Sequence, residues 1–227
     1  MDLQLYSHPL ASFCWKALTA LYENATPFEP VLVDLGDEVS ATRFKAIWPI
    51  AKMPVLHDRA RSCIVAESSI IIEYLDLHYP GETRFLPADP DLAWRARMWD
   101  RFYDHYIQHP MQKIVTDRLR PEGRNDPFGV DQAVAQIREA YQLLEGEMAG
   151  KLWAIGDDFT LADCAAAPAL FYAHTVVPLD PSQTNLRAYL DRLMARPAFA
   201  RVLDEAEPYF HLFPMAEKPR IARAAGR

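Results

Sequence analysis

Residues 53–68 read MPVLHDRARSCIVAES, and this stretch decides the fold that the sequence predicts. Two short apolar runs, 55–57 and 63–66, are separated by polar residues and predict the two strands of a hairpin. A proline cannot donate to a strand ladder, so Pro54 is expected at a strand start or at an edge. If the bond between Met53 and Pro54 is cis, the backbone N–H and C=O of Met53 turn outward, where they can pair with an extended peptide.

Glu67 and Ser68 follow the second strand and open an apolar helix that is expected to reach Tyr79. The N-terminus of a helix carries unpaired N–H groups and the positive end of the helix dipole, so it favours a carboxylate. Ser68 is expected to cap this helix. No Glu or Gln stands at the third helical position, so a reciprocal capping box is not expected and the N–H groups remain available to a ligand. With the Glu67 carboxylate facing an ammonium, the pair suits a small peptide whose end carries both charges.

The elements around this stretch predict an α/β N-terminal domain followed by an all-α domain. A strand at 3–7, a helix at 13–23 and a strand at 28–33 form a β-α-β unit, and a short helix at 41–48 precedes the hairpin. This is the thioredoxin-like order with a mixed four-stranded sheet, and a right-handed crossover places the second strand parallel to the first.

Beyond Tyr79 the chain is rich in Pro and Asp, and then it reads as helix. The expected helices cover 91–115, where Pro110 kinks or splits the helix, and 130–148, 160–172, 185–195 and 198–206. The expected organisation is a thioredoxin-like domain at 1–80, a linker at 81–90, an all-helical domain at 91–215 and a basic tail at 216–227, which we expect to be solvated.

Composition excludes several classes of protein. Half of the 227 residues are hydrophobic, which is enough for a sizeable core. The formal charge of −7 argues against a general nucleic-acid binder. No apolar run reaches the length of a membrane span, and no leader-like segment opens the chain. Three widely spaced cysteines suggest neither a disulfide framework nor a zinc site, and a reducing cytoplasm is the expected setting.

Three segments, in order and at the expected spacing, carry a resemblance to a known family. The segment from Lys52 to Leu75 resembles the glutathione-binding segment of soluble glutathione S-transferases. Residues 3–18 resemble the first strand and helix of bacterial theta-like and zeta-like members, and 159–163 resembles the start of the family's core C-terminal helix. The resemblance spans about the whole chain. It implies glutathione as a cosubstrate without a metal, a hydrophobic electrophile as second substrate, and a homodimer.

Ser12 is the first candidate for the catalytic group. It stands where the first strand gives way to the first helix, and the theta-like pattern has a serine at this spacing. A thiol attacks as its thiolate, and a hydroxyl that donates a hydrogen bond to sulfur, together with the helix dipole, lowers the thiol pKa from its usual ~8.5. The alternative is that Ser12 is only an N-cap. Ser7, at the end of the strand, is a weaker rival.

The resemblance also implies roles for the residues around the hairpin. Met53, before Pro54, would pair through its backbone with the cysteinyl part of glutathione, Lys52 would reach the glycyl carboxylate, and Glu67 and Ser68 would hold the charged end. Each has a plain alternative: a strand-opening trans-proline, a solvated lysine, and a surface carboxylate that stabilises the helix dipole.

Other residues have mainly structural interpretations. Cys14 lies at a helix N-terminus, where a thiol pKa can be depressed, but its apolar neighbours favour packing in the core. Thr160 and Asp163 predict a capping box at the head of an Ala-rich helix. The aromatic stretch 102–106 lies where a second substrate would bind, although packing in the helical bundle explains it as well. His105 and His109 lack further metal ligands.

The expected function is therefore transfer of glutathione to a small electrophile. One alternative is a glutathione-dependent thiol-disulfide or peroxide reductase that uses Cys14. Another is an isomerase with glutathione as cofactor, although Ala11 before Ser12 departs from the double serine of zeta-like members. A third is a non-enzymatic binding protein on the same fold.

Overall fold

The computed structural model describes residues 2–221. Its sheet has four strands in the order β2-β1-β3-β4. The strands are β1 (Leu3–Ser7), β2 (Glu29–Leu32), β3 (Val55–Asp58) and β4 (Cys63–Ala66). β1 pairs in parallel with β2 and antiparallel with β3, and β3 pairs antiparallel with β4. The mixed sheet and the hairpin that the sequence predicts are confirmed, except that Asp58 ends a strand instead of opening the turn.

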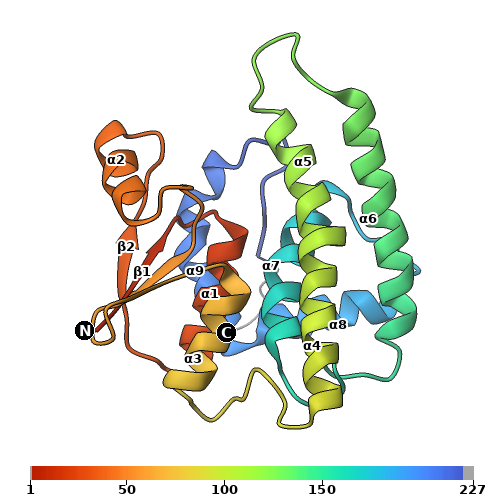
Figure 1. The fold of residues 1–227 in the computed structure, drawn as a ribbon. Helices are drawn as coiled ribbons and strands as arrows, with labels where there is room; N and C mark the ends of the chain where they lie inside the picture. Colours follow the sequence, from red (N-terminus) through yellow and green to blue (C-terminus); the bar gives the residue numbers. More distant parts are fainter. Residues whose placement is uncertain (1, 222–227) are drawn as a thin grey trace.

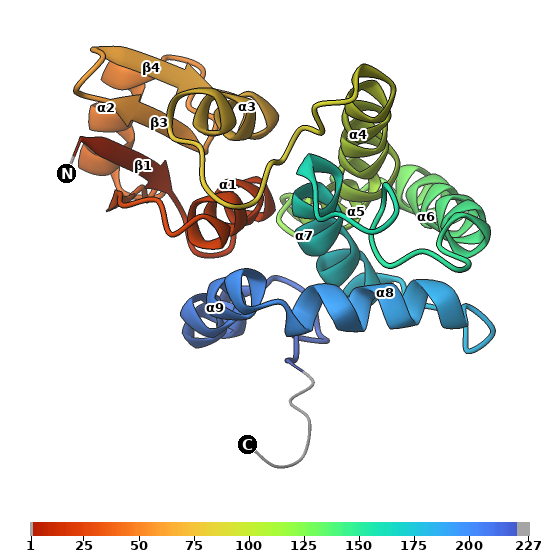
Figure 2. The same cartoon turned by 90° about the horizontal axis from the view of Figure 1, so that it is seen from below.

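Helices cover both faces of the sheet (Figures 1 and 2). α1 (Ser12–Glu23) and α3 (Ser68–His78) lie on the face toward the helical part, and α2 (Glu38–Ile47) lies on the other face. Side chains alternate along the strands to match. Leu5 and Leu56 pack with α1 and α3 in one cluster, whereas Val55 packs with Phe44 of α2 in another.

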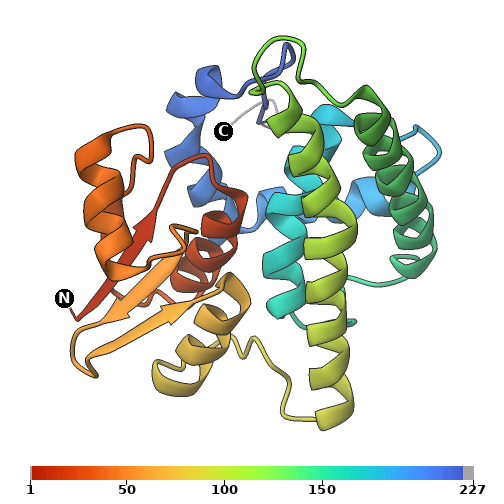
Figure 3. The same cartoon turned by 45° about the horizontal axis from the view of Figure 1, so that its top comes forward.

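The second part of the chain is helical and packs against α1 and α3 (Figures 1 and 3). Residues 79–89 form neither helix nor strand and lead from α3 to the next helix. The elements that follow are α4 (Pro90–Phe102), η1 (Tyr103–Gln108), α5 (His109–Asp117), α6 (Pro127–Glu147), α7 (Leu161–Val176), α8 (Thr184–Ala195), α9 (Pro197–Ala206) and η2 (Glu207–Leu212). No helix among residues 2–221 combines the length and apolar character needed to cross a lipid bilayer.

The helix expected at 91–115 is divided by η1, a π-helical segment. Pro110, at the start of α5, has no N–H, and its ring disfavours a regular turn before it. The π-helical turns carry the chain past this point without a break in direction, so α4, η1 and α5 form one rod in Figure 3. The prediction that Pro110 interrupts the helix is confirmed, and the form of the interruption matters for the site.

The helix α7 forms the centre of the helical core. All its residues from Leu161 to Ala173 are buried. The predicted capping box at its start is confirmed, and the Thr160 N–H donates to Asp163 Oδ2 at 2.8 Å. The other oxygen of Asp163 accepts from Ala154 N and from the Tyr189 hydroxyl at 2.8 and 2.6 Å, so the cap also ties α8 and the preceding loop to α7.

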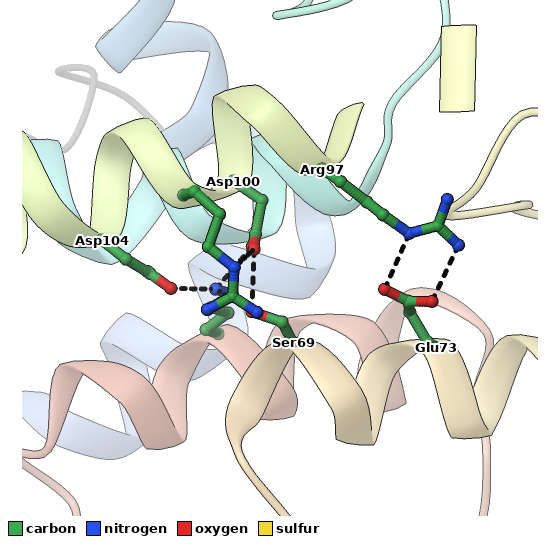
Figure 4. Close-up of polar contacts among 7 residues, drawn as sticks. Ser69, Glu73, Arg97, Asp100 and Asp104 are labelled. Atoms are coloured by element: carbon green, nitrogen blue, oxygen red, sulfur yellow. Dashed lines mark hydrogen bonds and ion pairs between the residues drawn. The ribbon is translucent and has the colours of Figure 1, made fainter. Parts of the chain in front are cut away.

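A buried ionic cluster joins the two parts of the chain (Figure 4). Lys16 of α1 lies 2.5 Å from Asp100 Oδ1 and 2.8 Å from Asp104 Oδ2, and its side chain is 1% exposed. Lys16 also donates to Ser69 Oγ, which in turn donates to Asp100. Burial, and then the like charge of Asp100, raises the pKa of Asp104, while Lys16 opposes that rise. The sequence analysis did not single out any of these four residues.

Candidate functional site

The residues that the sequence nominates line one cavity between the α/β part and the helical part. The cavity has a volume of about 730 Å³, within the usual range for small-molecule sites. Six of its lining residues are the ones named from the sequence: Ser12, Lys52, Met53, Pro54, Glu67 and Ser68. They come from three separate segments, which the sheet and its crossovers bring together. Their roles remain predictions, but their common location is a fact of the structure.

Ser12 is the first residue of α1, and the N-cap position is held by Ala11, which makes no side-chain cap. The alternative that Ser12 serves as the N-cap is therefore wrong. Its side chain instead faces the helical part, where Ser12 Oγ accepts a hydrogen bond of 2.5 Å from Gln108 Nε2. Ser12 is 8% exposed and lines the cavity at the positive end of the helix dipole.

The loop before Ser12 is held by one local and one long-range hydrogen bond. Trp15 Nε1 donates to the Pro9 carbonyl at 2.6 Å, and the Tyr172 hydroxyl donates to the Leu10 carbonyl at 3.1 Å. The rings of Trp15 and Tyr172 stack with centroids 4.6 Å apart. Because Tyr172 belongs to the buried helix α7, the position of Ser12 is tied to the core of the helical part.

The bond between Met53 and Pro54 is cis, and both residues line the cavity. Pro54 is buried directly before β3, at a strand start as expected. Lys52 is exposed at the cavity, where a flexible cation can meet an anionic group without a desolvation cost.

Glu67 and Ser68 meet the cavity at the start of α3, but their capping roles differ from the expected ones. Glu67 occupies the N-cap position and Ser68 is the first helical residue, so the expectation that Ser68 caps the helix is wrong. Glu67 makes no side-chain cap and has a φ of 70°, a conformation that is uncommon for residues other than glycine. Strained backbone of this kind clusters at ligand sites. Both Glu67 and Ser68 line the cavity, so the exposed Glu67 carboxylate and the N-terminus of α3 meet it together.

The helical wall of the cavity lies C-terminal to the aromatic stretch that was one candidate from the sequence. None of Phe102, Tyr103, His105 and Tyr106 lines the cavity; Tyr103 is fully buried and Tyr106 is half exposed. The wall is formed instead by residues of η1 and α5 and by the following turn: Gln108, His109, Met111, Gln112, Val115, Thr116 and Leu119. Phe13, Leu10 and Phe213 add apolar surface from other segments.

The cysteines do not present a reactive thiol at this cavity. Cys14 is fully buried, and burial raises its pKa to about 12, with a hydrogen bond to the backbone of His8 as a smaller opposing effect. Cys164 is also buried, and its pKa is raised for the same reason. A reductase mechanism that uses Cys14 needs the thiolate, which this environment disfavours. Across residues 2–221, no three His, Cys, Asp or Glu side chains gather as metal ligands would.

Comparison with known proteins identifies the family. Residues 5–83 match the model of the glutathione S-transferase N-terminal domain, and residues 102–197 match that of the C-terminal domain. Glutathione S-transferase 3 of Zea mays is 30% identical over 209 residues, which cover 88% of this chain and 93% of the maize protein. The chain belongs to the glutathione S-transferase family.

Two further proteins resemble this transferase over nearly its whole length. Protein LigF of a Sphingobium species is 38% identical over an alignment 249 positions long, gaps included, which covers 91% of this chain and 95% of LigF. A glutathione S-transferase of Methylobacterium radiotolerans, solved in complex with glutathione sulfonate, superposes with a TM-score of 0.77 at 28% identity and covers 100% of this chain and 99% of its own. The family, the fold and the enzyme class inferred from the sequence are thereby confirmed.

Sequence reasoning missed the contribution of η1 and α5 to the site of this transferase. Gln108 and Gln112 are polar residues on an amphipathic helix, and nothing in their local pattern sets them apart from surface residues. The only signal is Pro110, which marks an irregular turn within a helix. His8, which also lines the cavity, was missed as well; burial lowers its pKa, against a smaller opposite effect of Asp34.

Proposed function

We propose that this transferase binds glutathione in the cavity between its two parts and conjugates the glutathione thiolate to a small electrophile. The observation that carries the proposal is that one cavity is lined by a serine at a helix N-terminus, a cis-proline loop, and an acidic residue before a second helix N-terminus. The serine suits a thiol, the cis-proline loop suits a peptide backbone, and the acidic residue with its helix N-terminus suits a charged peptide end.

Each end of glutathione has a chemically matched partner in this arrangement. The Glu67 carboxylate suits the ligand's ammonium, and the N–H groups at the start of α3, beside Ser68, suit the adjacent carboxylate. The backbone of Met53 would pair with the cysteinyl part, and the exposed Lys52 would meet the carboxylate at the other end. This placement directs the sulfur toward Ser12 at the start of α1.

The Ser12 hydroxyl would stabilise the thiolate by donating a hydrogen bond to the sulfur. A thiol with the ordinary pKa of ~8.5 is about 3% thiolate at pH 7, and a pKa near ~6.5 would raise that fraction to about three quarters. The remaining acceleration would come from holding the two reactants together. Met111, Val115 and Leu119 offer an apolar wall to the second substrate.

The first test is calorimetric titration of glutathione into the wild type, Glu67→Gln and Ser12→Ala. We expect glutathione to bind the wild type, to bind Glu67→Gln about tenfold or more weakly, and to bind Ser12→Ala with little change. Conjugation of a chlorodinitrobenzene probe should fall strongly in Ser12→Ala. Lack of glutathione binding by the wild type would refute the proposal.

The same titration separates the alternative functions. Wild-type binding without conjugation of any electrophile would favour an isomerase that uses glutathione as a cofactor, or a binding protein. Activity that survives in Ser12→Ala and is lost in Cys14→Ser would favour a reductase.

The proposal includes a homodimer in the cytoplasm. Exposed apolar side chains on α3 and α4, among them Leu77, Trp94 and Met98, support an interface between two copies. Sedimentation velocity on the full chain tests this part, and a monomer at micromolar concentration would contradict it.

A further inference from the structure

Gln108 occupies a special position in the rod formed by α4, η1 and α5. It is the last residue of the π-helical segment and lies two residues before Pro110. It is 3% exposed, yet it lines the cavity. π-Helical turns occur often at functional sites because they alter the direction in which a side chain leaves the helix. In this chain the irregular turn accompanies a buried amide at the cavity wall.

The amide of Gln108 acts directly on Ser12. Gln108 Nε2 donates to Ser12 Oγ at 2.5 Å, although the two residues are 96 positions apart in the sequence. The rings of Phe13 and His109, their neighbours in the chain, contact each other edge to face, which holds the start of α1 against the start of α5. A hydroxyl that accepts a hydrogen bond from an amide keeps its own hydrogen to donate elsewhere. The accepted bond also polarises the hydroxyl and strengthens the bond that it donates.

The oxygen of the Gln108 amide adds a second observation. Gln108 Oε1 is buried and has no hydrogen-bond partner among the described residues. Buried polar atoms are normally paired, and an orphaned one calls for an explanation. The amide oxygen has almost no accessible surface, so it is the Nε2 half of Gln108 that acts toward Ser12.

We propose that Gln108 is a positioning residue that orients the Ser12 hydroxyl, so that its hydrogen is donated to the thiolate of the bound substrate. The proposal rests on the function proposed above for the same cavity. Gln108 Nε2 holds Ser12 Oγ as an acceptor. The reverse orientation of the amide would accept the Ser12 hydrogen and take it away from sulfur, so the orientation of this one group decides whether Ser12 can act.

Substitution of Gln108 by Glu tests this orientation. The carboxylate introduced by Gln108→Glu has nearly the same shape as the amide, but it can only accept, so it would capture the Ser12 hydrogen. Gln108→Met removes both the donor and the acceptor at similar length and keeps an apolar side chain in the buried position. Gln112→Glu is the matched control, because Gln112 lines the same cavity on α5 and is exposed. It introduces an equal charge without contact to Ser12.

The measurement is a pH titration of the thiolate absorbance of enzyme-bound glutathione, together with the pH profile of kcat/KM for the same variants. We expect the wild type to depress the thiol pKa and Ser12→Ala to lower the thiolate fraction at neutral pH about tenfold. Gln108→Glu should reproduce the loss seen in Ser12→Ala, and Gln112→Glu should show a clearly smaller loss. Ser12→Ala combined with Gln108→Met should lose no more thiolate than Ser12→Ala alone, because the two residues act as a unit.

The outcomes distinguish the two proposals. If the wild type itself does not depress the thiol pKa, then the proposed role of Ser12 fails, whatever Gln108 does. If the wild type depresses it and Gln108→Glu and Gln108→Met both keep the wild-type titration, then Gln108 has only a packing role and the inference is overturned. Equal losses in Gln108→Glu and Gln112→Glu would assign the effect to charge in the cavity and would also overturn it. Should Gln108→Glu fail to fold, Gln108→Met alone decides the question.

Discussion

Replacement of Lys16 by Met should destabilise the protein more than almost any other single change outside the apolar core. The Lys16 ammonium lies within 2.8 Å of Asp100 and Asp104 and is 1% exposed. Met fills a similar volume, so packing changes little while the cation that contacts both carboxylates is lost. Ser69 would keep its hydrogen bond to Asp100, but a hydroxyl cannot neutralise two acids.

The expected loss can be worked from the burial of the cluster. Removal of one partner from a buried ion pair usually costs about 3–5 kcal/mol, because the other charge stays buried and uncompensated. In a chain of this size, each kcal/mol lowers the melting temperature by about 2–4 °C, so the loss should be about 6–20 °C.

Urea denaturation of the wild type, Lys16→Met and Arg97→Met measures the effect. Arg97 is the matched control, because its pair with Glu73 also joins the two parts of the chain, linking α4 to α3 with two hydrogen bonds at 3.0 and 2.9 Å (Figure 4). The Arg97 side chain is 48% exposed, and exposed pairs of this kind contribute about 0–1 kcal/mol. Lys16→Met should therefore lose several times more stability than Arg97→Met.

The loss in Lys16→Met should also depend on pH in a defined direction. The pKa of Asp104 in the folded protein is raised above its unfolded value, so the folded state binds the proton more tightly. Its contribution to stability is present at pH values below the unfolded pKa of about 3.9, and it is lost as the pH rises through the folded pKa. Without Lys16, which opposes the rise, the folded pKa moves higher. The deficit of Lys16→Met relative to the wild type should therefore be larger at pH 7 than at pH 5.

A deficit below about 1 kcal/mol at pH 7, or one equal to that of Arg97→Met, would refute this reasoning. It would mean that water or a rearranged carboxylate solvates the cluster, and that the cluster contributes little to holding the two parts of the chain together. A deficit that is the same at pH 5 and pH 7 would contradict the expected effect of Lys16 on the pKa of Asp104.

Two other predictions concern buried titratable groups. Asp163→Asn should cost about 2–3 kcal/mol in urea denaturation, because Asn has a single acceptor oxygen for the bonds that both Asp163 oxygens accept from Ala154, Thr160 and Tyr189. The control Asp158→Asn, at an exposed position, should lie within about 0.5 kcal/mol of the wild type. Equal losses in the two variants would contradict the prediction. Burial raises the pKa of Cys14 to about 12. Iodoacetamide at pH 8 should therefore alkylate the half-buried Cys63 of the native protein well before Cys14, as measured by mass spectrometry of peptides. Early alkylation of Cys14 would restore it as a candidate nucleophile.

Much of this fold could be predicted from the sequence because its signals are local. The hairpin at 55–66 is marked by two apolar runs and a polar turn, and Pro54 marks the start of a strand. Thr160 and Asp163 identify a helix start through a spacing of three residues. Each of these patterns acts within one turn or one strand, where propensity and hydrogen bonding between near neighbours determine the outcome.

The details that failed depend on backbone angles that side-chain identity does not specify. Ser68 has the chemistry of an N-cap, yet Glu67 takes that position with a positive φ. The helix at 91–115 has an apolar periodicity that continues through η1, so the pattern alone did not show that the register changes there. Of the two interpretations of the aromatic stretch 102–106, the one as a wall for a second substrate is therefore wrong, since residues 108–119 form that wall.

The groups that we expect to matter for the chemistry and for the contact between the two parts come from distant positions in the sequence. Lys16 meets Asp104 across 88 residues, and Ser12 meets Gln108 across 96. In the sequence Lys16 is a lysine four residues from the start of α1, which is typical of a solvated residue. In the folded protein it is 1% exposed and contacts Asp100 of α4 and Asp104 of η1. Both pairs join α1 to the same rod, one turn of α1 apart. A change in how that rod packs would therefore alter the ionic cluster and the hydroxyl of Ser12 together, which gives the stability of the interface between the two parts a direct connection to the candidate catalytic group.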